Sequence, residues 1–158
     1  MSNDPFVLEP HVWFAVLCGG LAIDKQGRIN LQGVFSQHRF FVPPPTTGIQ
    51  PHAHLRGVIA IGLSGGEGQF EAEIDLRDMD DKILWARPEG KWTFEVGLGA
   101  KPSAFLGQEV NLWLTAPGRY YFLLRLSPGH LEHRIHLEVA ENIGPAQPEG
   151  PPSGGPTG

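Results

Sequence analysis

Hydrophobic and polar residues alternate with a two-residue period along most of this chain, and that pattern is typical of half-buried β-strands. The alternation is clearest in residues 69–77, and the segments 92–98, 110–114 and 131–139 repeat it. Each segment would turn one row of side chains toward a core and the other toward water. No segment shows the 3.6-residue period of an amphipathic helix.

Turn signals rich in Gly, Pro, Asp and Ser separate these segments at roughly ten-residue intervals. The first apolar strand, a turn at Asp24–Gly27 and a strand running through residues 28–42 read as a hairpin. We predict further hairpin turns at Ser64–Gly68, at the APG of 116–118 and at the SPGH of 127–130. The sequence therefore predicts an all-β fold, an antiparallel β-sandwich (jelly-roll or Ig-like) of about eight to nine strands, with a closed β-barrel as the alternative.

The length of 158 residues, of which 41% are hydrophobic, suits one domain with a substantial core. We expect residues 1–10 to form an N-terminal arm, residues 11–141 the sandwich, and residues 142–158 a disordered tail. The tail is almost wholly Gly, Pro, Ser, Gln and Glu, so it cannot bury enough apolar surface to offset the entropy of ordering it.

Charge and cysteine content restrict the partners and the compartment. The net charge of −5 comes without clustered Lys or Arg, so nucleic acid is not an expected partner. Cys18 is the single cysteine, which excludes an intramolecular disulfide and favours the cytoplasm. The apolar run Val12–Ile23 has no Lys or Arg before it and is shorter than the about 20 residues of a membrane span. We expect it to be a strand buried on both faces, and we expect no membrane contact.

Three histidines in GHLEHRIHLEV, residues 129–139, raise the question of a metal site. In an extended strand His133 points toward the core, whereas His130 and His136 point the other way and lie about 20 Å apart. A metal would have to recruit His52 and His54 from the third strand to join His136. We expect ordinary histidines, no metal and no other cofactor, and keep a metal-binding protein or metal-dependent enzyme as an alternative.

Four aspartates, Asp75, Asp78, Asp80 and Asp81, crowd one end of the fourth strand and could attract calcium. Aspartate is also a common turn residue, so we interpret the cluster as a solvated turn. No pair of carboxylates, Cys–His arrangement or phosphate loop stands out, and we predict no enzymatic activity.

Trp113 is out of phase with Val110, Leu112 and Leu114, which places it on the solvent side of its strand. Tyr121 and Leu123 break phase in the same way in the next strand. If the short APG connection makes these strands neighbours, Trp113, Tyr121 and Leu123 share an exposed apolar patch, which is typical of protein contact sites.

The segments FAVLCGGLAIDKQGRINLQGVFSQHRF, DLRDMDDK and LTAPGRYYFLLRLSPGHLEHRIHLEV resemble a family of small, uncharacterised prokaryotic proteins. The shared pattern is an opening strand, a G-K/R-x-x-L-x-G hairpin and a closing PG-x-Y-x-F-x-L pair of strands. The resemblance implies a single β-sandwich domain and supplies no activity or active-site motif.

These observations favour a non-enzymatic β-sandwich that acts as a binding or assembly module and contacts a protein partner or a second copy of itself. Two alternatives remain open. One is the metal-binding protein or metal-dependent enzyme, and the other is a small-ligand binder with a pocket between its sheets.

Overall fold

The computed structural model describes residues 8–34, 39–42, 53–97 and 104–141, and these residues contain strands and turns but no helix. The strands are β1 (His11–Ile23), β2 (Ile29–Val34), β3 (Arg39–Val42), β4 (Ala53–Ser64), β5 (Gly68–Asp78), β6 (Ile83–Ala86), β7 (Trp92–Val96), β8 (Ala104–Leu114), β9 (Gly118–Ser127) and β10 (Glu132–Glu141).

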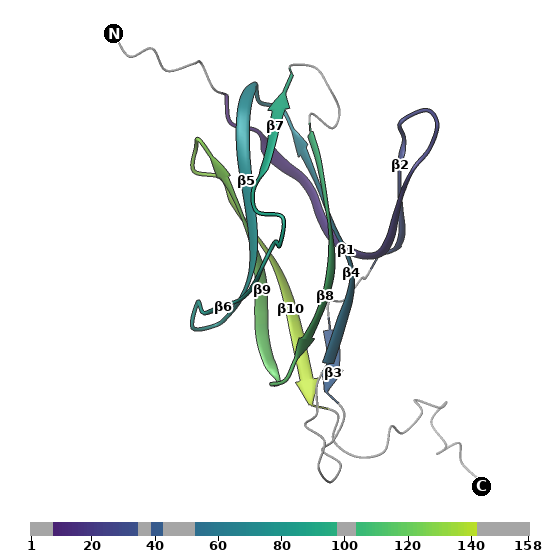
Figure 1. Cartoon of the computed structure of the whole chain (residues 1–158), viewed down its shortest axis with the longest axis vertical. Coiled ribbons are helices and arrows are strands. Elements are labelled where there is room, and N and C mark those ends of the chain that lie inside the picture. Colours follow the sequence, from purple (N-terminus) through teal and green to yellow (C-terminus); the bar gives the residue numbers. More distant parts are fainter. Residues whose placement is uncertain (1–7, 35–38, 43–52, 98–103, 142–158) are drawn as a thin grey trace, which may run out of the picture.

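The strands form two sheets (Figure 1). One has four strands in the order β2-β1-β4-β8, and the other has six, in the order β3-β10-β9-β5-β6 with β7 also paired to β5. All pairs are antiparallel except β3 with β10, which run parallel. Over the described residues the predicted sandwich is confirmed, and the alternative of a closed barrel is not what the chain forms.

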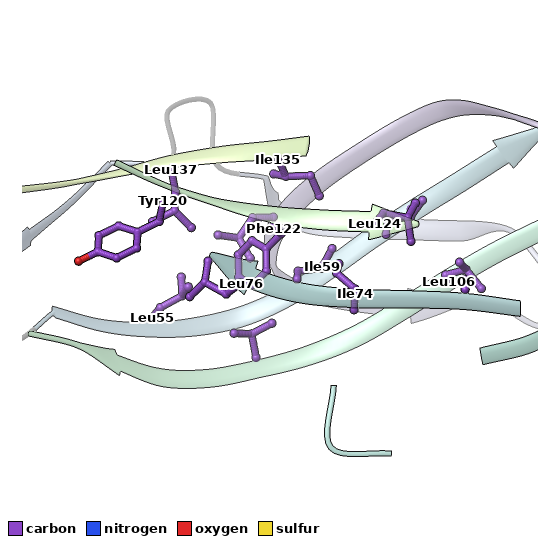
Figure 2. Packing of buried hydrophobic residues seen from close by; sticks show 14 of the residues in the cluster. Leu55, Ile59, Ile74, Leu76, Leu106, Tyr120, Phe122, Leu124, Ile135 and Leu137 are labelled. Atoms are coloured by element: carbon purple, nitrogen blue, oxygen red, sulfur yellow. The ribbon is translucent and has the colours of Figure 1, made fainter. Parts of the chain in front are cut away.

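The core lies between the two sheets and is built from the inward rows that the alternation predicts. Figure 2 shows Leu55 and Ile59 of β4 meeting Leu76 of β5, Phe122 of β9 and Ile135 of β10. All five are buried. Burial of each such side chain contributes about 1.5–3 kcal/mol, so this row-on-row packing is the main stabilisation of the sandwich.

Two connections predicted as hairpin turns instead carry the chain from one sheet to the other. The Ser64–Gly68 turn joins β4 to β5, and residues 116–118 join β8 to β9, and both pairs of strands lie in different sheets. Turn residues determine where the chain reverses, but they do not determine with which strand the segment after the turn forms hydrogen bonds. The turns between β1 and β2, β5 and β6, and β9 and β10 do join paired strands.

The predicted long second strand is in fact two strands. β2 ends at Val34, just after Gly33, which adopts a φ of 62°. β3 then pairs with β10 in the opposite sheet. The proline-rich connection of residues 43–52 lies outside the described residues, as do the tail at 142–158 and residues 1–7 of the N-terminal arm. Leu8 exchanges backbone hydrogen bonds of 2.9 and 2.8 Å with Glu67.

β1 is not buried on both faces, contrary to prediction. Only Leu17 and Cys18 of this strand are buried, and the side chain of Trp13 is 60% exposed. The pairing of β1 with β4 is irregular between Val12 and Phe14, where Trp13 lies, and β1 changes partner at Cys18, which pairs with both Val58 of β4 and Val34 of β2. Beyond Cys18 β1 pairs with β2 alone, and the β1–β2 hairpin rises on the right of Figure 1.

Candidate functional site

The outward face of the four-stranded sheet presents Trp113 at one end. Trp113 lies on β8 opposite His54 of β4, and its side chain is 56% exposed. The two rings stack with centroids 3.9 Å apart and planes 15° from parallel. His54 Nε2 is in turn 2.5 Å from Oδ1 of Asn111, so the imidazole is held against the indole. The stacked rings of Trp113 and His54 therefore form an exposed aromatic surface whose side chains have few alternative rotamers.

Near the other end of this face, two side chains of β1 lie over the neighbouring strands. A Cβ on Gly107 of β8 would lie 3.2 Å from Cδ2 of Leu21, and one on Gly62 of β4 would lie 2.2 Å from the ring of Phe14. Large side chains of β1 thus rest on glycines of the neighbouring strands, because only glycine leaves room for them.

Cys18 of β1 is also buried. Its Sγ lies 3.4 Å from the carbonyl oxygens of Gly20 and Val58, and the side chain is inaccessible. Burial raises the pKa of the Cys18 thiol above its ordinary value, an effect that the hydrogen bond to Gly20 partly opposes. A protonated, buried thiol is a packing group and not a nucleophile.

A cleft of about 480 Å³ opens between the first part of β1 and the hairpin, and we call it the hairpin cleft. Its lining residues are Trp13, Phe14, Gln26, Gly27, Arg28, Ile29 and Leu31. Four of them are large and apolar, while Gln26 and Arg28 supply polar groups from the turn. Sequence reasoning missed this cleft, and the only signal in the chain was the Gly19-Gly20 pair inside the apolar run that begins at Val12.

The outward face of the six-stranded sheet is charged. Asp75 is only 5% exposed and its carboxylate accepts hydrogen bonds from Arg77 at 2.7 and 3.1 Å and from Arg125 at 3.3 Å. The hydrogen bond to Asp75 raises the pKa of the Arg77 guanidinium. Arg125 also pairs with Glu73 at 2.9 Å, so neighbouring charges on this face neutralise one another.

Tyr121 and Leu123 lie on this charged face, yet their side chains are only 2% and 4% exposed. Arg134 places its guanidinium carbon 4.7 Å from the centre of the Tyr121 ring. The Tyr121 hydroxyl donates to the Asp81 carboxylate, a bond that raises the pKa of Tyr121. Long polar side chains therefore cover the apolar groups that the alternation left on the solvent side.

The predicted patch of Trp113, Tyr121 and Leu123 does not exist as one surface. β8 and β9 belong to different sheets, so their outward residues lie on opposite faces of the sandwich. The assumption that the short APG connection makes the strands neighbours was wrong. Trp113 is exposed as predicted, whereas Tyr121 and Leu123 are buried.

The histidines predicted as weak metal ligands are also separated. His54 is on the four-stranded sheet and His136 on the six-stranded one, while His52 lies outside the described residues. In the described part of the chain no group of three His, Cys, Asp or Glu residues could hold a metal ion. His133 points inward as predicted, and its pKa is lowered by burial and by the nearby His136.

The aspartate cluster is a turn, as expected, with one difference. Asp78 Oδ1 accepts the backbone N–H groups of Asp80 and Lys82 at 2.9 and 3.0 Å, which is how aspartate stabilises a turn. Asp81 has a φ of 62°, a left-handed conformation that aspartate tolerates. Asp75 is not solvated, since the arginines of β5 and β9 enclose it.

Comparison of the sequence with protein-family models and with curated proteins found no match. The resemblance to an uncharacterised prokaryotic family therefore stays a prediction. The described residues contain no helix of the length and apolar character that a membrane span requires.

Proposed function

We propose that this protein is a non-enzymatic binding module that docks onto another protein, or onto a second copy of itself, through β8 around Trp113. The observation that carries the proposal is the exposed indole, 56% accessible and stacked on His54. Tryptophan is the residue most enriched among the side chains that dominate binding energy at interfaces. A ring that is already held in place loses little further entropy when it binds.

The position of β8 adds a second argument. Among the described strands β8 pairs with β4 alone and forms one edge of its sheet. An edge strand offers backbone N–H and C=O groups that a strand from another chain can use. The eleven residues of β8 contain no proline, so none of them lacks an N–H for such a pairing.

We also propose a cytoplasmic location, because the chain has a single cysteine and cannot form an intramolecular disulfide. The one cysteine is buried and free, so the fold makes no use of an oxidising compartment.

The test is light scattering coupled to size-exclusion chromatography, followed by co-purification from the native host, with wild type and Trp113→Asp. Trp113→Asp should abolish self-association or the capture of the partner that wild type shows. Met79→Asp is the matched control, because Met79 is equally exposed but lies on the turn between β5 and β6. A wild-type protein that is monomeric and captures no partner would contradict the proposal.

A further inference from the structure

The hairpin cleft lies apart from Trp113 and combines an apolar lining with a positive charge at one end. Trp13 and Phe14 of β1 form one side, and Ile29 and Leu31 of β2 form the other. Its volume of about 480 Å³ lies within the range of small-molecule sites. Because the sheet and the hairpin both contribute to it, a ligand would contact two elements at once.

Arg28 supplies the charge. Its Nε donates to Asp24 Oδ2 at 2.6 Å, and its backbone N–H donates to Asp24 Oδ1 at 2.8 Å. These bonds tie Arg28 to the turn, and the Arg28 side chain is otherwise 76% exposed. Arg28 also lines the cleft, and its two terminal nitrogens are further donors that an anionic group can use.

Asp24 neutralises part of the charge of Arg28, and the terminal nitrogens of the guanidinium remain as donors for an anionic group. Hydrogen bonds from the backbone and side chain of Arg28 lower the pKa of the Asp24 carboxyl. The carboxylate is therefore ionised at neutral pH and keeps the guanidinium pointed along the turn.

From this geometry we propose that the hairpin cleft binds a free amphipathic anion, a molecule with a single apolar chain and a carboxylate head group. The chain lies between Trp13 and Phe14 on one side and Ile29 and Leu31 on the other. The head group binds the terminal nitrogens of Arg28. This inference does not depend on the proposed protein contact at Trp113, because neither β8 nor His54 lines the cleft.

The experiment measures binding of decanoate, with decanol and acetate as probes that lack the charge and the chain respectively. Isothermal titration of wild type should show saturable binding of decanoate below about 1 mM, weaker binding of decanol and none of acetate. Trp13→Ala should weaken the binding of decanoate and decanol alike. Arg28→Gln should lower the affinity for decanoate about tenfold and leave the affinity for decanol unchanged.

Two matched variants show whether these losses are local. Trp113→Ala removes a tryptophan of similar exposure on the same sheet, and Lys25→Gln removes a positive charge from the same turn. Both should bind decanoate like wild type, and all variants should keep the wild-type circular dichroism spectrum. Loss of self-association in Trp113→Asp with intact decanoate binding would separate the two proposals.

Failure of wild type to bind decanoate at about 1 mM would overturn the inference. Equal affinity of Arg28→Gln and wild type for decanoate would do the same. A lipid surface presents related chemistry, so sedimentation with vesicles containing phosphatidylglycerol forms a separate arm. Trp13-dependent sedimentation with those vesicles, without binding of monomeric decanoate, would assign the cleft to a membrane and contradict a free ligand.

Discussion

The outward faces of the two sheets both carry apolar side chains, and they shield them by different means. On the four-stranded sheet large side chains of β1 lie over glycines of the neighbouring strands, Phe14 over Gly62 and Leu21 over Gly107. On the six-stranded sheet Arg134 and its neighbours cover Tyr121 and Leu123.

The difference matters for binding. On the six-stranded face Arg77 pairs with Asp75 and Arg125 with Glu73, so these charges neutralise one another in place. On the four-stranded face the hairpin cleft opens between the first part of β1 and the β1–β2 hairpin. We therefore expect the six-stranded face to contribute mainly stability, and the four-stranded face to contribute binding.

The largest effect that tests this comparison is the truncation of Tyr121. Tyr121→Ala removes a buried ring and should lower the free energy of unfolding by about 3–5 kcal/mol. Trp113→Ala, at an exposed position in the other sheet, should lower the free energy of unfolding by about 1 kcal/mol or less, mostly because the stacking contact with His54 is lost. Urea unfolding of both variants checks the difference. Equal losses would show that Tyr121 is no more part of the core than Trp113.

The next effect concerns the root of the hairpin. A Cβ on Gly57 would lie 2.6 Å from the carbonyl oxygen of Cys18, where β1 passes from β4 to β2. Gly57→Ala should therefore force the two strands apart and cost about 1–3 kcal/mol in thermal or urea unfolding. Gly97→Ala is the control, since no heavy atom lies within 4 Å of its Cβ position. An unchanged stability of Gly57→Ala would mean that β1 is not tightly packed at this point.

A smaller loss of stability is expected when one arginine is removed from the charged face of the six-stranded sheet. Arg77→Met keeps the apolar part of the side chain and removes the guanidinium that donates two hydrogen bonds to Asp75. Because Arg125 still contacts Asp75, the free energy of unfolding should fall by only about 1 kcal/mol. Urea unfolding of Arg77→Met at neutral pH measures the loss. A variant more stable than wild type would show that the guanidinium is not needed to neutralise Asp75.

The smallest effect is a dependence on pH from the inner face. Burial, and secondarily the charge of His136, lower the folded-state pKa of His133 below its ordinary value of 6.5. The folded protein therefore binds fewer protons than the unfolded chain as the pH falls through 6.5, and its stability declines until the folded-state pKa is passed.

Replacement by a group that does not titrate tests this expectation. His133→Gln should show a smaller drop in melting temperature between about pH 7.5 and 5.5 than wild type does. His136→Gln should reduce the drop less, because burial is the larger cause. Identical pH profiles for wild type and His133→Gln would assign the dependence to other groups.

Much of this fold follows from the sequence alone, because side-chain alternation is a local property. The inward row of β5, with Phe70, Ala72, Ile74 and Leu76, is buried as its period of two predicts. The turn at Asp24–Gly27 and the one after Asp78 occur where their residue types favour them.

Only the tertiary structure decided which strands became neighbours and which outward residues were covered. The APG segment reverses the chain equally well within one sheet or between two, so Trp113 could not be separated from Tyr121 by sequence. The burial of Tyr121 depends on Asp81 and Arg134, and the hairpin cleft depends on where β1 leaves β4. These are contacts between residues distant in the chain, which no periodicity of a single strand encodes.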